Sequence, residues 1–125
     1  MVVFTGGEPL LQLDRHITGA LRHLGFEIAV ETNGTLPVPE GVDWVCVSPK
    51  AGATLAVRSG DELKLVFPQK NAPPEEYQGL DFRIFYLQPL DGPERLRNTQ
   101  LAVRYCLEHP PWRLSLQTHK LLGIR

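Results

Sequence analysis

Val2-Val3-Phe4-Thr5-Gly6-Gly7-Glu8-Pro9 decides the fold of this chain, because an apolar run ends abruptly in two glycines, a carboxylate and a proline. The apolar run predicts a short strand. The glycines lack Cβ atoms, so a ligand can approach the backbone closely. Pro9 has no N–H and disfavours helical geometry at Glu8, which keeps that residue extended. We therefore expect a backbone-lined binding edge directly after the first strand.

The composition is that of an ordinary globular protein. The chain has 125 residues, 42% of them hydrophobic, and a formal net charge of −1, which suffices for one domain over residues 1–125. No basic run favours a nucleic-acid partner, and no apolar run approaches the roughly 20 residues of a membrane helix. The two cysteines, Cys46 and Cys106, lie far apart within apolar patterns. We interpret them as buried core residues of a cytoplasmic protein.

Strand-like and helix-like segments follow one another along the chain. Apolar residues at helical spacing from Leu10 to Leu24 predict one helix that starts after Pro9 and ends at Gly25. A second helix is predicted around residues 101–106, ending at Pro110-Pro111. We expect strands near residues 2–4, 26–31, 44–48, 63–67, 82–88 and 112–118, and a loop or short turn at 71–79.

Polar residues recur where the predicted strands end. They form a set that we call the rim, at residues 5–8, 31–34, 48–50, 88–91 and 117–120. Both α/β barrels and open α/β sheets place their ligand sites at the carboxyl ends of the strands. The sequence therefore predicts a single ligand site along this rim.

Six motifs occur in an order and spacing that is similar to one enzyme family. They are Phe-Thr-Gly-Gly-Glu-Pro-Leu-Leu-Gln (4–12), Glu-Thr-Asn-Gly-Thr (31–35), Val-Ser-Pro-Lys (47–50), Leu-Lys-Leu-Val-Phe (63–67), Leu-Gln-Pro-Leu-Asp (87–91) and Gln-Thr-His-Lys-Leu-Leu-Gly-Ile-Arg (117–125). Together they resemble the 7-carboxy-7-deazaguanine synthases of the radical S-adenosylmethionine superfamily. The resemblance covers nearly the whole chain and implies an α/β fold, an incomplete parallel β/α barrel.

The resemblance also implies an activity. In that family, 6-carboxy-5,6,7,8-tetrahydropterin is contracted to 7-carboxy-7-deazaguanine with loss of ammonia, on the route to queuosine. The reaction uses S-adenosylmethionine, a [4Fe-4S] cluster and Mg²⁺, and the family forms cytoplasmic homodimers. Three cluster-binding cysteines and the Mg²⁺ ligand precede the matched region in the family. We therefore expect this chain to correspond to the C-terminal portion of such an enzyme.

Site residues follow from the same motifs. The resemblance assigns the cofactor to Gly7, Glu8, Ser48, Pro49, Lys50, Gln88, Pro89, Leu90 and Asp91. It assigns the pterin to Thr5 and to the chain terminus at Arg125. Glu31, Gln117 and His119 can also match the donors and acceptors of a pterin ring. No catalytic residue and no metal ligand is assigned within the chain.

Other readings of the same residues stay open. A different radical S-adenosylmethionine enzyme, such as an activase, would share Gly-Gly-Glu-Pro. A non-catalytic remnant could bind a nucleoside or a partner chain. A Rossmann-type dehydrogenase is disfavoured because no Gly-x-Gly-x-x-Gly follows any predicted strand.

The spacing of Cys46 and Cys106 fits no iron–sulfur cluster, so we expect these 125 residues alone to be unable to cleave S-adenosylmethionine reductively. Anaerobic reconstitution with iron and sulfide, followed by assay for 5′-deoxyadenosine, is the measurement. We expect no product, and clear formation of 5′-deoxyadenosine by the chain alone would contradict the expectation.

Overall fold

The computed structural model describes residues 1–124, and its main feature is one six-stranded sheet. The strands are β1 (Val2–Phe4), β2 (Ile28–Thr32), β3 (Trp44–Val47), β4 (Ser59–Phe67), β5 (Asp81–Pro89) and β6 (Trp112–Leu114). The helices are η1 (Pro9–Leu11), α1 (Arg15–His23), η2 (Pro74–Glu76), α2 (Arg95–Glu108) and α3 (Thr118–Leu122). All six predicted strands are therefore confirmed, with shifted ends.

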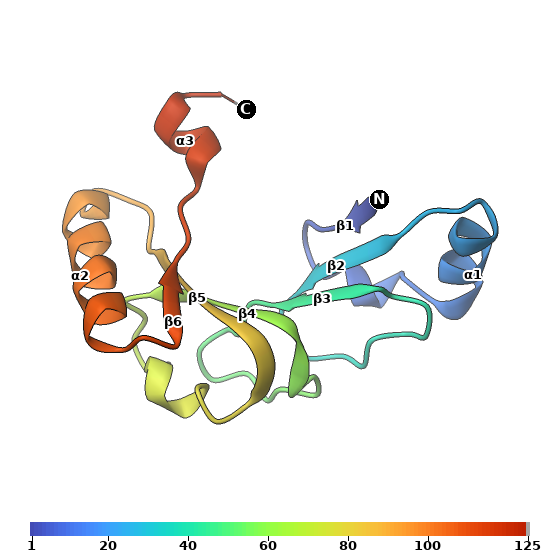
Figure 1. The fold of residues 1–125 in the computed structure, drawn as a ribbon, viewed down its shortest axis with the longest axis horizontal. Coiled ribbons are helices and arrows are strands. Elements are labelled where there is room, and N and C mark those ends of the chain that lie inside the picture. The colour runs from blue at the N-terminus through green and yellow to red at the C-terminus, as the bar shows by residue number, and fades with distance from the viewer. Residues whose placement is uncertain (125) are drawn as a thin grey trace.

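Every strand pairs in parallel with the next one along the chain, giving the order β1-β2-β3-β4-β5-β6. Among the described residues, β1 and β6 do not pair with each other, so the sheet is curved but open (Figure 1). The fold is thus an open α/β partial barrel. Parallel pairing brings the carboxyl ends of all the strands to one edge.

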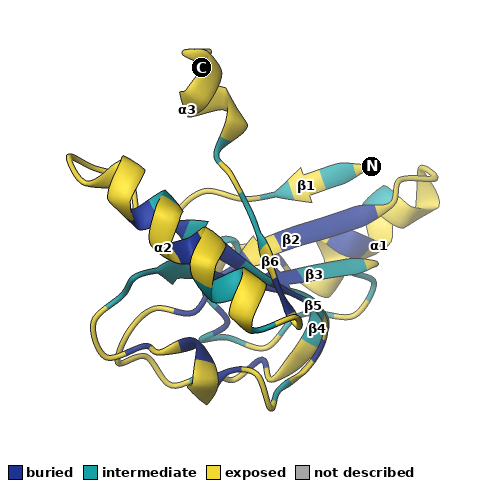
Figure 2. Cartoon of the chain, turned by 60° about the vertical axis from the view of Figure 1, so that its left-hand side comes forward, coloured by how far each residue is buried: buried dark blue, intermediate teal, exposed yellow. Residues whose placement is uncertain are grey.

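The two faces of the sheet differ because successive side chains point to opposite sides. On β4, Leu63 and Leu65 are completely buried, whereas Lys64 between them is partly exposed. The buried face forms the main core with Trp112 and with Ala102 of α2. The other face carries the charged residues and lines the open side of the curved sheet. Figure 2 shows that β2 is mostly buried, whereas α3 is exposed.

The single helix predicted from Leu10 to Leu24 is wrong in its extent. The structure has the short turn η1, then a break, and then α1. Asp14 is the N-cap of α1. Its carboxylate accepts hydrogen bonds from the backbone N–H groups of His16 and Ile17, both at 2.9 Å. An aspartate that caps in this way starts a new helix instead of continuing the old one. Gly25 follows the end of α1 with φ of +80°, as predicted.

The C-terminal strand is also shorter than predicted. It ends at Leu114, and α3 begins at Thr118, the last residue of the expected strand, and stands apart from the rest of the molecule (Figure 1). The second helix and the turn within 71–79 are confirmed as α2 and η2. Within residues 1–124, none of the helices combines the length and the apolar character needed to cross a lipid bilayer.

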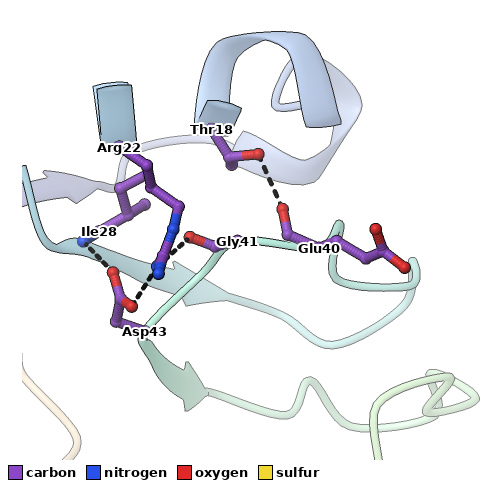
Figure 3. A network of polar contacts seen from close by, with 6 residues as sticks. All are labelled: Thr18, Arg22, Ile28, Glu40, Gly41 and Asp43. Carbon is purple, nitrogen blue, oxygen red and sulfur yellow. Dashed lines mark hydrogen bonds and ion pairs between the residues drawn. The ribbon is translucent and has the colours of Figure 1, made fainter. Parts of the chain in front are cut away.

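A polar network attaches α1 to the loop before β3 (Figure 3). The hydroxyl of Thr18, which is 1% exposed, donates to the backbone oxygen of Glu40 at 2.7 Å. Asp43 accepts from Arg22 and, at 2.9 Å, from the backbone N–H of Ile28. These two bonds hold the pKa of Asp43 below its ordinary value. The network fixes the helix against the start of β2 and β3.

We expect Thr18→Val to lower the free energy of unfolding by about 2 kcal/mol, because it removes the donor of a part-buried hydrogen bond and leaves the Glu40 carbonyl without its partner. Thr18→Ser keeps the hydroxyl and loses one methyl group, so it should cost only about 0.8 kcal/mol. Urea denaturation of the three proteins measures both values. A Thr18→Val protein as stable as Thr18→Ser would contradict the role of this bond.

Candidate functional site

One cavity of about 470 Å³ lies at the carboxyl ends of the strands. Residues following β1, β2, β3 and β6 meet there, together with residues of β4 and β5. Its lining consists of Thr5, Gly6, Gly7, Glu31, Thr32, Asn33, Ser48, Lys50, Lys64, Val66, Gln88, Ser115, Leu116, Gln117 and His119. Each of the five rim segments therefore contributes at least one residue to this cavity.

The glycine edge of the cavity is open to a ligand. Gly6 and Gly7 have φ of +79° and +41°, a backbone conformation that residues other than glycine rarely adopt. A Cβ atom placed on either residue would meet nothing within 4 Å. The backbone thus passes along the cavity with free space beside it. A ligand in the cavity can therefore approach this backbone closely.

Glu8 does not line this cavity. Its carboxylate accepts from the backbone N–H of Leu10 at 3.0 Å, from the hydroxyl of Thr32 at 2.7 Å and from the backbone N–H of Asn33 at 2.8 Å. These bonds join the segment after β1 to the end of β2. In this structure, Glu8 holds the glycine edge in place relative to the neighbouring strand.

Two lysines give the cavity positive charge. Among residues 1–124, Lys50 has no carboxylate within ion-pair distance, so it is available to a ligand's carboxylate. Lys64 donates to the carboxylate of Glu31 at 3.2 Å. Burial lowers the pKa of Lys64, but the charge and hydrogen bond of the Glu31 carboxylate act in the opposite direction, and the pKa is raised overall. Lys64 is therefore a cation at neutral pH.

The predicted residues at the end of β5 divide into two groups. Gln88 lines the main cavity, where its amide offers both a donor and an acceptor. Pro89 lies in a small adjacent pocket, and Leu90 is 45% exposed. Asp91 pairs with Lys120 of α3 at 2.6 Å, which holds the pKa of Asp91 below its ordinary value. Pro49 is buried, and Arg125 lies outside the described residues.

The cysteines do not fit an iron–sulfur cluster. Burial raises the pKa of Cys46 to about 12, and burial also raises the pKa of Cys106. A [4Fe-4S] cluster needs several cysteines gathered in one place, whereas Cys46 lies on β3 and Cys106 on α2, so the two do not form such a set. In the described part of the chain, no three residues of the types His, Cys, Asp and Glu gather as a metal site.

Lys64 lines the cavity, although the sequence motifs assign it no role. The signal was present, because Lys64 alternates with the apolar residues Leu63 and Leu65 in a strand whose neighbours are also strands. A charged residue in the middle of a central strand indicates a polar cavity on that face. Val66 and Ser115 also line the cavity, and neither carries a sequence signal that would single it out.

Several proteins named 7-carboxy-7-deazaguanine synthase are similar in sequence to this chain. The 7-carboxy-7-deazaguanine synthases of Caulobacter vibrioides and Bradyrhizobium diazoefficiens are 65% and 62% identical to it over 99% of its length. The chain spans 59% of each of these relatives. The crystal structure of QueE from Escherichia coli matches 93% of the chain and 55% of that protein, with a TM-score of 0.70 and 32% identity. No family model matches. The resemblance seen in the motifs is confirmed.

We expect Glu8→Gln to destabilise the protein by about 1–3 kcal/mol. The carboxylate of Glu8 accepts three hydrogen bonds through two oxygens, whereas an amide has only one acceptor oxygen. Glu27→Gln is the matched control, since Glu27 is exposed, and it should change stability by no more than about 0.5 kcal/mol. Urea titrations measure both. Equal stability of the two variants would show that Glu8 does not hold the rim together.

Proposed function

We propose that this chain forms the cofactor- and substrate-binding part of a 7-carboxy-7-deazaguanine synthase. The observation that carries the proposal is the single cavity in which the open glycine edge, Lys50 and Gln88 meet Glu31 and His119. The identity to curated synthases over almost the whole chain supports the same reaction. The substrate would be 6-carboxy-5,6,7,8-tetrahydropterin, and the products 7-carboxy-7-deazaguanine and ammonia.

The chain's residues would divide the cavity between two molecules. The backbone acceptors at Gly7 suit the ammonium group of S-adenosylmethionine, and the ammonium group of Lys50 suits its carboxylate. Ser48 and Gln88 line the same cavity and offer hydroxyl and amide groups for the ribose or adenine. Bound S-adenosylmethionine would supply the radical chemistry of the reaction.

The pterin would occupy the remaining polar lining. Thr5, Glu31 and His119 provide a hydroxyl, a carboxylate and an imidazole around the same volume. A pterin is a flat ring that alternates donors and acceptors along its edge, so side chains of mixed type at several angles can bind it. We propose a contact of Arg125 with the pterin as well, on the resemblance alone, since this residue lies outside the described part of the chain.

Other components of the complete enzyme are proposals of the same kind. We propose that the [4Fe-4S] cluster is held by cysteines other than Cys46 and Cys106, because these two lie on different elements. The resemblance places the Mg²⁺ ligand with those cluster cysteines. We also propose a cytoplasmic homodimer. Exposed apolar side chains of and after α3, with Leu122 at 67% and Ile124 at 59%, support an interface.

We expect Gly7→Val to abolish S-adenosylmethionine binding measured by isothermal titration calorimetry, because the new side chain fills the space beside the backbone. Lys50→Ala should weaken binding about tenfold, as for one lost charge-assisted hydrogen bond. Gly25→Val is the control for backbone strain, since Gly25 also has a positive φ of +80° and open space but lies outside the cavity. Unchanged affinity in Gly7→Val would place the cofactor elsewhere.

A further inference from the structure

Lys64 and Glu31 form an ion pair within the lining of the cavity. We infer that Lys64 is a positioning residue, which holds the carboxylate of Glu31 so that it can accept from the amino-pyrimidinone edge of the pterin. The inference rests on the proposed function and adds a residue to which the motifs assign no role.

The strand register makes this pair possible. Glu31 of β2 pairs with Cys46 of β3, which in turn pairs with Glu62 of β4, and Lys64 follows two residues later on the same face. Lys64 must therefore reach across β3, a span of roughly 10 Å for two strand spacings. Cys46 is the residue in between, and its small side chain leaves the path open. A larger residue there would block the contact.

The neighbouring carboxylate does not compete for Lys64. Glu62 lies on the same face, but it accepts a hydrogen bond from the indole N–H of Trp44 at 2.9 Å. Lys64 is directed to Glu31 instead, with the ammonium nitrogen 3.2 Å from Oε1. The side chain of Lys64 is only 21% exposed, while that of Glu31 is 46% exposed. Lys64 is thus the more buried partner of the pair.

This arrangement leaves one carboxylate oxygen of Glu31, Oε2, free for a ligand. The only hydrogen bond of its carboxylate within residues 1–124 is the one from Lys64 to Oε1, so Oε2 is available. A 2-amino-4-oxopyrimidine edge presents two adjacent N–H donors, which suit one carboxylate. Without Lys64, a half-exposed glutamate would sample several rotamers, and binding would have to order it. Lys64 therefore contributes by pre-organising Glu31.

The test is a double-mutant cycle on the 125-residue chain, read by quenching of the intrinsic fluorescence of 6-carboxypterin. We expect Lys64→Met to weaken binding about tenfold and Lys64→Arg, which keeps the charge, to restore it to within about threefold. In the Glu31→Gln background, Lys64→Met should change affinity less than twofold, because its target is gone. Lys70→Met, at an exposed lysine outside the cavity, is the matched control.

A second ligand separates positioning from direct contact. 6-Carboxylumazine keeps the ring and the carboxylate but has an oxygen in place of the 2-amino group, so it cannot use Glu31 fully. Lys64→Met should then weaken its binding less than twofold. Equal losses with both ligands, or a full loss in the Glu31→Gln background, would mean that Lys64 binds the ligand itself. Unchanged binding of 6-carboxypterin by Lys64→Met would overturn the inference alone, whereas no binding by the unsubstituted chain would overturn the proposed function too.

Discussion

Parallel pairing of all six strands is the constraint on which the rest of this structure depends. It brings residues far apart in the chain, such as Thr5 and His119, to one edge and so creates one cavity. The register within the sheet then decides which side chains meet there. A shift of one residue would turn Lys64 into the core and Leu63 into the cavity. The site and the core are therefore determined by the same set of backbone hydrogen bonds.

The difference between the two faces of the sheet explains the chemistry of the cavity. Helix α2 and the loops cover the apolar face, where Leu63, Leu65 and Leu87 have no exposed surface. Within residues 1–124, no helix covers the curved opposite face, so charged groups there keep contact with water and need no full compensation. This permits a lysine in the middle of β4. It also leaves the backbone at Gly6 and Gly7 accessible.

Much of this could be predicted from the sequence. The strands, the rim and most lining residues follow from apolar runs that end in polar residues, because that pattern is local. The break at Asp14 was missed because apolar spacing continued through it and hid the cap. The pairing of Lys64 with Glu31 depends on the register across three strands, which no local pattern contains. The role of Glu8 was missed for a similar reason, since Thr32 and Asn33 reach its carboxylate only in the folded sheet.

The sides of the cavity are held with unequal strength. Its base consists of paired strands, whereas Gln117 and His119 come from the segment around α3, which stands apart from the sheet. Within residues 1–124, the exposed pair of Asp91 and Lys120 is the one side-chain bond that joins α3 to the rest. Salt screens such pairs, and elements with few buried contacts open at low free-energy cost. The width of the cavity at His119 is therefore a variable that ionic strength and a bound ligand can both set.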